Sequence, residues 1–459
     1  MGKHTQNENQ TKRGVPESAL IGTTETVTIE RMATGPEGIA HLASGLTVFV
    51  DGAAPGDVAR IEIRQDKGSF ARASIVELLE ASSSRVRPTC PYGDVCGGCP
   101  WQHLEYQVQL DAKRDNVIAA LTHTAHVPLE KAQSLVAPVC GSKRQWGYRN
   151  KLELNAYNDE RGKFQLGFAQ EGSHQFFSPD TCPIAVKSIQ KAPKALRGAL
   201  RYLQGANDLG IYRVGVRASV RTRDVEVALW TNSGPFPRAQ AAKMIQGALK
   251  PSSVVRVIAD PGRARKIKNV EMLSGKGCWE EELYGNRFLT SAPAFFQVNT
   301  AQAEKLIELV LAGLEIGEDS YVADLYSGGG TFSIPLAATG AEVVAVESVG
   351  ASVRDLRRNA ERAGVFVDVI GGDAAREIQE LEDLDALVVD PPRAGLAKGV
   401  AEDIAAAGPA RVAYVSCNPQ TWARDVVRLE AVGYHLLSVQ PVDMFPQTFH
   451  CEIVSIFAR

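Results

Sequence analysis

The C-terminal part of the chain, from about residue 291 to 459, alternates short apolar runs with helical patterns. Near-continuous apolar strands that alternate with helices are typical of a doubly wound parallel sheet, which helices cover on both faces. Ligands bind such a sheet at the carboxyl ends of its strands. The residues that follow each apolar run are therefore the first candidates for a functional site. Four runs fit this pattern: residues 321–325, 342–346, 386–390 and 412–415.

A glycine-rich loop, Gly328-Gly329-Gly330, follows the first run and opens a helix. Glycine lets the backbone approach a ligand closely at the end of a strand. The dinucleotide-binding fingerprint would need a further glycine at the position of Ser333, so the loop disfavours NAD. Glu347 ends the second run, where a carboxylate can accept hydrogen bonds from both hydroxyls of a ribose. The pattern therefore indicates a cofactor other than NAD.

Two further residues can carry chemistry beside this loop. Cys417 lies in Ser-Cys-Asn-Pro just after the last run, and Glu452 lies in His-Cys-Glu against another short apolar run. An isolated cysteine is usually a small buried hydrophobic residue, and a glutamate is often one half of an ion pair. A nucleophile and a base beside one cofactor are, however, the minimum set for alkylation of a carbon atom. The pair therefore indicates covalent catalysis.

These C-terminal elements resemble the signature of the RNA uracil-C5 methyltransferases, and the glycine loop is similar to motif I of class I S-adenosylmethionine methyltransferases. Phe295 and Gln297 resemble the family's entry motif, in which the phenylalanine lies near the target base and the glutamine contacts the cofactor. Ser327 stands where the family usually has cysteine, a position with no assigned chemistry. The resemblance implies a Rossmann-like α/β domain that binds S-adenosyl-L-methionine. The cofactor-binding residues that it implies are Gln297, Tyr326, Thr331, Glu347, Asp373 and Asp390.

The reaction that the resemblance implies needs both Cys417 and Glu452. Carbon 5 of uracil is a poor nucleophile, and addition of a thiolate at carbon 6 creates an enolate with electron density at carbon 5. After methyl transfer, a base must remove the proton from carbon 5 so that the thiol can leave. We expect Cys417 to be the nucleophile and, by resemblance to the family's His-x-Glu setting, Glu452 to be the base.

Four other cysteines form a second chemical feature. Cys90, Cys96 and Cys99 are spaced Cys-x5-Cys-Gly-Gly-Cys, and Cys182 lies far downstream before a proline. Disulfides are rare in the cytoplasm, and four thiolates suit either zinc or an iron–sulfur cluster. Zinc usually takes two paired Cys-x2-Cys spacings, so the triplet favours the cluster, and many members of the family carry a four-iron (4Fe-4S) cluster on this pattern. We expect structural roles for Cys140, Cys278, His450 and Cys451.

The length of 459 residues predicts several domains, and residues 1–20 form a polar tail that we expect to be disordered. Residues 21–82 carry short β-type runs between Gly and Pro turns and resemble the TRAM domain, a small OB-like β-barrel that binds RNA. Residues 83–285 predict an α+β central domain, and residues 286–459 predict the methyltransferase domain. The central domain is expected to hold a helix at 105–121 and strands at 151–157, 212–221 and 225–230.

The net charge of −3 counts mildly against RNA binding, but local basic segments can still supply phosphate contacts. No apolar run approaches the roughly 20 residues of a membrane span, and the first ten residues are polar. We therefore expect a cytoplasmic monomer without membrane contact. The basic segments are either RNA contacts or solvated strand faces. They comprise Arg213, Arg217, Arg221 and Arg223, and Arg263, Arg265, Lys266 and Lys268.

The residues and the resemblance together predict an enzyme, an S-adenosylmethionine-dependent RNA (uracil-C5)-methyltransferase that acts on ribosomal or transfer RNA. The target nucleotide must leave any helix or stack to reach Cys417, so we expect a loop or a locally unfolded region as substrate. A cytosine-C5 RNA methyltransferase is one alternative. A noncatalytic RNA-binding iron–sulfur protein is another, although the complete set of candidate site residues disfavours it.

Overall fold

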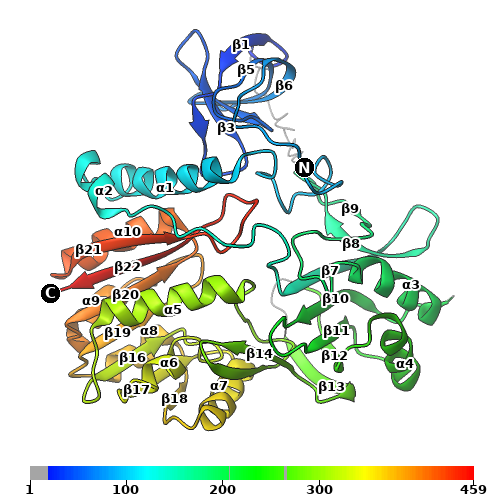
Figure 1. Ribbon diagram of the computed structural model, residues 1–459, viewed down its shortest axis with the longest axis vertical. Coiled ribbons are helices and arrows are strands. Elements are labelled where there is room, and N and C mark those ends of the chain that lie inside the picture. Colours follow the sequence, from blue (N-terminus) through cyan, green and yellow to red (C-terminus); the bar gives the residue numbers. More distant parts are fainter. Residues whose placement is uncertain (1–18, 206, 263–265) are drawn as a thin grey trace, which may run out of the picture. The chain divides into compact units, whose positions relative to one another are not determined.

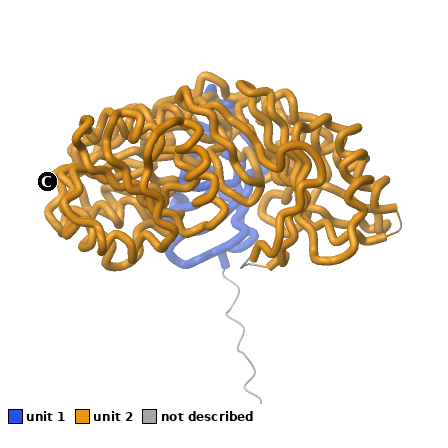
Figure 2. Tube along the Cα trace, turned by 90° about the horizontal axis from the view of Figure 1, so that it is seen from below, with its two compact units in different colours: residues 1–85 blue, residues 86–459 orange. Residues whose placement is uncertain are grey.

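The computed structural model describes residues 19–205, 207–262 and 266–459. The chain divides into two compact units, residues 1–85 and 86–459 (Figure 2). Most of the expected disordered tail falls on residues 1–18, outside the described residues. Within the described ranges, no helix combines the length and the apolar character that a membrane span needs.

The first unit is the expected small β-domain. Its six strands form one sheet in the order β1-β5-β6-β4-β3-β2, and only the β4–β6 pair is parallel. Alternating side chains such as Val27, Val48 and Ile61 fill its core, because every second residue of a strand points to the same side. The strands are β1 (Thr24–Thr28), β2 (Arg31–Met32), β3 (Gly38–His41), β4 (Thr47–Asp51), β5 (Val58–Asp66) and β6 (Ala71–Glu80).

The second unit contains a mainly antiparallel seven-stranded sheet, which we call the central sheet (Figure 1). Its strand order is β13-β12-β11-β10-β7-β8-β9, and only β11 and β12 run parallel. Helices α3 (Ala192–Gln204) and α4 (Arg238–Leu249) cover one face of it with an apolar core. The strands are β7 (Lys151–Asn158), β8 (Phe164–Ala169), β9 (Phe176–Phe177), β10 (Ile211–Ala218), β11 (Val225–Thr231), β12 (Ser253–Ala259) and β13 (Ile267–Gly275).

Strand β10 ends earlier than the expected range of 212–221. After Ala218, the Ser219 hydroxyl accepts hydrogen bonds from the backbone N–H groups of Arg221 and Thr222, and Arg223 takes a positive φ of 61°. A hydroxyl that captures backbone donors in this way favours a turn over a strand. The expected strand end was therefore wrong by three residues.

The methyltransferase sheet also has seven strands, in the order β18-β17-β16-β19-β20-β22-β21. Its first five strands are parallel, and β22 joins β20 antiparallel, so the expected α/β fold is confirmed with one reversed hairpin at its edge. The strands are β16 (Tyr321–Leu325), β17 (Glu342–Glu347), β18 (Asp368–Gly371), β19 (Ala386–Val389), β20 (Arg411–Ser416), β21 (His435–Val442) and β22 (Glu452–Ala458).

Helices cover both faces of this sheet, each over its own apolar core (Figure 1). One face packs against α5 (Thr300–Leu314), α6 (Ser333–Ala337) and α7 (Gly350–Ala363). The other face packs against α8 (Ala374–Glu377), α9 (Val400–Ala407) and α10 (Pro419–Ala431), together with two helices from much earlier in the chain. These are α1 (Tyr106–His123), where the helix at 105–121 was expected, and α2 (Leu129–Leu135).

The division between a central and a methyltransferase domain is less simple in space than along the sequence. α1 and α2 belong to the expected range 83–285, yet they pack on the methyltransferase sheet. The expected boundary at residue 285 falls between the paired strands β14 (Trp279–Leu283) and β15 (Asn286–Thr290). The domain limits therefore stay a prediction.

Candidate active site

The glycine loop adopts backbone conformations that explain its composition. Gly328 has a φ of 57° and Gly330 a φ of 97°, in the left-handed region that glycine tolerates best. A Cβ atom at Gly330 would lie 2.5 Å from Leu356 of α7, so the loop packs tightly on that helix. Tyr326, at the start of the loop, is also left-handed, with a φ of 64°. Such strain in a residue with a side chain is typical of functional loops.

Acidic residues at the ends of β17 and β18 lie next to this loop. The Glu347 carboxylate accepts hydrogen bonds from the backbone N–H groups of Gly328, at 2.9 Å, and Val349, at 2.6 Å. Asp373 is exposed, and its carboxylate caps α8 by accepting a hydrogen bond from the N–H of Ala375 at 3.0 Å. Carboxylate oxygens have several lone pairs, so both side chains can accept further hydrogen bonds from a ligand.

Two further carboxyl groups lie at the carboxyl ends of β16 and β19: Asp324 is buried and Asp390 is partly buried. Asp324, at the end of β16, accepts a hydrogen bond from the Ser333 hydroxyl through one oxygen, while its other buried oxygen has no partner among the described residues. Burial raises the pKa of Asp324 to about 7, and burial followed by repulsion from Asp324 raises the pKa of Asp390 to about 7. Buried carboxyl groups of this kind favour a ligand that carries positive charge. S-adenosylmethionine, a sulfonium cation, fits that requirement.

The segment before α5 holds Phe295 and Gln297 in contrasting settings. Phe295 is 63% exposed, whereas Phe296 packs edge-on against Trp279 with ring centroids 5.3 Å apart. The Gln297 side chain is buried, and its backbone carbonyl accepts a hydrogen bond from Asn150 Nδ2 at 2.9 Å. The segment is therefore firmly held while the Phe295 ring projects into solvent.

The reversed hairpin brings Cys417 and Glu452 together. The β20–β22 ladder ends with the pair of Ser416 and Ile453, and one further step of this antiparallel register sets Cys417 opposite Glu452. Glu452 is buried, and burial, followed by repulsion from Asp390, raises its pKa well above the usual value. Burial also raises the pKa of the Cys417 thiol, with a further contribution from Glu452. The two side chains are therefore electrostatically coupled neighbours.

Arg393 is a site residue to which the sequence analysis gave no role. The positive charge of its guanidinium opposes the rise that burial causes in the pKa of the Cys417 thiol. Its backbone carbonyl accepts hydrogen bonds from Asn418 Nδ2, at 3.1 Å, and Thr421 Oγ1, at 3.0 Å, so the start of α10 holds the arginine beside the cysteine. The signal was present in the sequence, as the last residue of Asp-Pro-Pro-Arg after β19.

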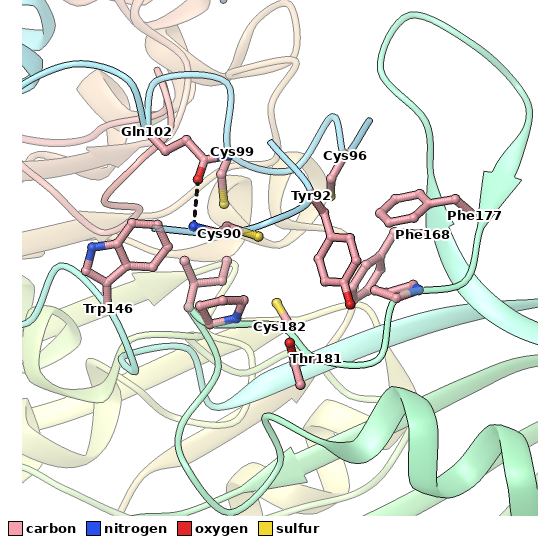
Figure 3. Close-up of a pocket in the computed structure, with 13 residues that line it drawn as sticks. Cys90, Tyr92, Cys96, Cys99, Gln102, Trp146, Phe168, Phe177, Thr181 and Cys182 are labelled. Atoms are coloured by element: carbon pink, nitrogen blue, oxygen red, sulfur yellow. Dashed lines mark hydrogen bonds between the residues drawn. The ribbon is translucent and has the colours of Figure 1, made fainter. Parts of the chain in front are cut away.

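The structure gathers the predicted residues at two places. At the carboxyl edge of the methyltransferase sheet lie the glycine loop with Tyr326 and Thr331, and also Glu347, Asp373, Asp390, Cys417 and Glu452. Cys90, Cys96, Cys99 and Cys182 line a separate cavity, into which their sulfur atoms point (Figure 3).

Mutual proximity marks this cysteine cavity as more than packing. Burial, and then the nearby thiol of Cys96, raises the pKa of Cys182 to about 11, and Cys99 is coupled to all three others. Within the described residues, no three His, Cys, Asp or Glu side chains are grouped closely enough to hold a single metal ion.

The two basic segments are mostly engaged within the protein. The Arg217 side chain is buried and donates to the carbonyls of Ser291 and Ala294. Arg221 pairs with Glu304. The remaining pairs are Arg213 with Glu153 and Lys268 with Asp260, and Arg263 and Arg265 lie outside the described residues. Neighbouring carboxylates and carbonyls thus engage four of the described members, and RNA contact by either segment stays a prediction.

The fold and the site define a Rossmann-like class I methyltransferase that follows a small N-terminal β-domain in the sequence. Residues 19–76 match the TRAM domain, and residues 105–371 and 373–459 match the tRNA (uracil-5-)-methyltransferase family. The chain belongs to that family. It is therefore an S-adenosylmethionine-dependent RNA (uracil-C5)-methyltransferase, with RNA as its substrate.

Known relatives cover almost the whole chain. An uncharacterized RNA methyltransferase of Gloeobacter violaceus is 37% identical over 456 residues, which are 97% of this chain and 98% of the relative. The 23S rRNA (uracil(1939)-C(5))-methyltransferase of Yersinia enterocolitica is 32% identical over 445 residues, 95% of each chain. The crystal structure of Pyrococcus abyssi tRNA (uracil-54, C5)-methyltransferase with S-adenosyl-L-homocysteine superposes with a TM-score of 0.74 at 26% identity, covering 95% of this chain and 100% of that one.

Proposed function

We propose that the protein methylates carbon 5 of uridine through a covalent adduct between Cys417 and carbon 6 of the base. The observation that carries this proposal is the facing position of Cys417 and Glu452 at the sheet edge that also holds the glycine loop. A nucleophile, a base and a cofactor loop at one edge supply every group that the reaction needs.

Arg393 favours the thiolate form of Cys417, which is the form that attacks the base. Burial disfavours the Cys417 thiolate, and the positive charge of the Arg393 guanidinium opposes that effect. The thiolate adds to carbon 6 and pushes electron density to carbon 5 and the neighbouring carbonyl oxygen. When bound, S-adenosyl-L-methionine supplies the methyl group that this carbon takes up.

Glu452 acts in the second half of the reaction. It removes the proton from carbon 5, the ring double bond re-forms, and the bond between carbon 6 and the Cys417 sulfur breaks to return the thiolate. A carboxylate with a raised pKa is a stronger base than an ordinary glutamate, and burial gives Glu452 that property. Glu452 is therefore suited to remove the carbon 5 proton, which an exposed carboxylate would remove slowly.

The remaining site residues bind cofactor and base. Glu347 and Asp373 accept hydrogen bonds from the ribose and the adenine, and Asp390 faces the methyl donor. Gln297, Tyr326 and Thr331 complete the cofactor site. The exposed Phe295 ring offers a surface against which the extruded uracil stacks.

We propose that Cys90, Cys96, Cys99 and Cys182 hold a 4Fe-4S cluster in a structural role. Their shared cavity supports this assignment. Protein purified without oxygen should contain about four irons per chain. Cys96→Ser should lose that iron, whereas Cys140→Ser, at a cysteine outside the cavity, should keep it. Stoichiometric zinc in place of iron would overturn the assignment.

RNA carrying 5-fluorouridine tests the covalent mechanism. Fluorine replaces the proton that Glu452 must remove, so the methylated adduct should persist and migrate as a slow band on a denaturing gel. Glu452→Gln should form the same band with ordinary RNA, and Cys417→Ala should form none with either. Rapid turnover of Glu452→Gln without the slow band would contradict the assignment of Glu452 as the catalytic base.

For the RNA target we propose 23S ribosomal RNA first, supported by the 32% identity to the Yersinia enzyme over 95% of both chains. Transfer RNA is the second candidate, supported by the TM-score of 0.74 to the archaeal enzyme. We expect a monomer that acts in the cytoplasm. Mass-spectrometric mapping of 5-methyluridine in RNA from cells with and without the protein separates the two targets. A change in 5-methylcytidine would favour the cytosine-C5 alternative.

A further inference from the structure

The loop that leads into Glu452, residues 443–451 between β21 and β22, contains a strained residue. Gln447 has a φ of 73°, in the left-handed region that residues other than glycine rarely adopt. Such a conformation persists only where surrounding contacts enforce it. Those contacts therefore decide how the chain enters β22, and with it where Glu452 lies.

The side chain of Gln109, on α1, supplies most of these contacts. It is fully buried, and its Oε1 accepts a hydrogen bond from the Gln447 N–H at 2.9 Å while its Nε2 lies 3.1 Å from Gln447 Oε1. The same Nε2 donates to the carbonyl of Trp101 at 3.1 Å and to that of Leu104 at 3.0 Å. One amide group therefore joins the loop to the segment that carries three of the four cavity cysteines.

Trp101 makes a second, independent connection. It lies two residues after Cys99 and donates its backbone N–H to the carbonyl of Gln447 at 3.1 Å. Its buried indole ring packs edge-on against Phe449, with ring centroids 6.4 Å apart. Residues 443–451 are thus bonded to the cysteine segment on both sides of the strained position.

The nucleophile is connected to α1 in another place, because α10 packs on that helix and Thr124 Oγ1, at its C-terminal end, donates a hydrogen bond to Gln420 Oε1 at 3.1 Å. Cys417 lies at the junction of β20 and α10, where Asn418 and Thr421 hold Arg393. The loop before Glu452 is therefore held near the start of α1, and the helix after Cys417 near its end.

We propose that Gln109 and Trp101 are positioning residues through which the cysteine segment sets the placement of Glu452. This inference rests on the proposed function, because it assigns Glu452 to proton removal. A disturbance of Gln109 or of the cysteine segment slows release of the methylated product and leaves formation of the Cys417 adduct unchanged.

Gln109→Met tests the proposal with nearly constant side-chain volume, and Gln107→Met, an exposed position on the same helix, is its control. Adduct formation with 5-fluorouridine RNA should stay within about twofold of wild type in both variants. With ordinary RNA, Gln109→Met should release product about tenfold more slowly and accumulate the adduct, since buried hydrogen bonds are lost. Equal slowing of both steps, or of neither, would overturn the proposal.

Hydrogen exchange provides a measurement that does not depend on turnover. Amides of residues 443–451 should exchange about tenfold faster in Gln109→Met and in Cys96→Ser than in the wild-type chain, and those of α10 should not change. Unchanged exchange in the loop of both variants would contradict the coupling, including in the case that Gln109→Met is inactive. If wild-type protein forms no adduct with 5-fluorouridine RNA, the covalent mechanism fails, and the exchange result still decides the coupling.

Discussion

The second unit contains two seven-stranded sheets that differ in strand direction. In the methyltransferase sheet, five parallel strands end at one edge, and residues from Tyr326 to Glu452 meet there. In the mainly antiparallel central sheet, most consecutive strands run in opposite directions, and Arg213 and Arg217 pair with a carboxylate or with backbone carbonyls. Parallel strands thus bring candidate reactive residues together at one edge, whereas the antiparallel sheet supports neighbouring segments.

This difference explains why Arg217 points to the methyltransferase site without taking part in it. Its guanidinium holds the carbonyls of Ser291 and Ala294, just before Phe295 and Gln297. It also stacks on Trp279, 5.7 Å from the ring centroid. The central sheet thereby supports the segment that carries Phe295 and Gln297, the residues proposed to contact the base and the cofactor.

The sharpest test of this comparison replaces one cysteine in each region. Cys417→Ala, at the parallel edge, should lower methyl transfer at least about 1,000-fold and leave S-adenosylmethionine affinity unchanged, because the nucleophile is lost and the cofactor contacts remain. Cys278→Ala, at a buried cysteine beside β14, should keep the rate within a few-fold. Single-turnover methylation assays measure both. Comparable losses in the two variants would show that reactive groups are not confined to the parallel edge.

The parallel edge was also the part that could be predicted from sequence. The last residues of each apolar run mark the carboxyl end of a strand. Glu347, Asp390 and Cys417 could therefore be predicted from local pattern and resemblance. The pairing of Cys417 with Glu452 depends on the antiparallel register of β20 and β22, which no local pattern reports. Arg393 was missed because an exposed arginine after a strand looks like a solvated residue.

The central sheet was harder to predict for a physical reason. Arginines at every fourth position of residues 213–221 predict a basic face, but the sequence does not show which carboxylates lie across the sheet. Glu153 reaches Arg213 from the neighbouring strand β7, and Glu304 reaches Arg221 from α5. Long-range ion pairs therefore hold Arg213 and Arg221 against carboxylates that no local pattern reveals.

Arg217 and Arg213, on the same strand, give the next largest expected contrast. Arg217→Ala should lower the free energy of unfolding by about 3 kcal/mol, because two carbonyls lose a buried charged donor, and should weaken cofactor binding through Gln297. Arg213→Ala should cost about 1 kcal/mol, since it removes a half-exposed ion pair with Glu153 and stacking on Trp230. Urea unfolding and calorimetric titration measure these effects. Equal costs would refute the supporting role of Arg217.

A smaller effect concerns pH and the parallel edge alone. With a pKa of about 7, Asp390 is largely protonated below pH 7, and a bound sulfonium cation favours its ionised form. S-adenosylmethionine affinity should therefore fall by up to about tenfold per pH unit below 7. S-adenosylhomocysteine, with a neutral sulfur, should show a weaker dependence, and Asp390→Asn should remove the difference. Identical pH profiles for the two ligands with wild-type protein would contradict the electrostatic role of Asp390.

The smallest expected effect concerns the salt dependence of RNA affinity, and it compares basic side chains with and without an ion-pair partner around one cavity. Arg213, Lys268 and Arg354 all line it, but the first two are paired with Glu153 and Asp260. Arg354, on α7, is exposed and has no ion-pair partner among the described residues. Each neutralised phosphate of a single strand contributes about −0.7 to the log–log slope of RNA affinity against salt. The double variant Arg213→Ala/Lys268→Ala should therefore leave the slope unchanged, whereas Arg354→Ala should flatten it by about 0.7. A slope that flattens by about 1.4 in the double variant would mean that RNA displaces both carboxylates, and that the central sheet binds substrate directly.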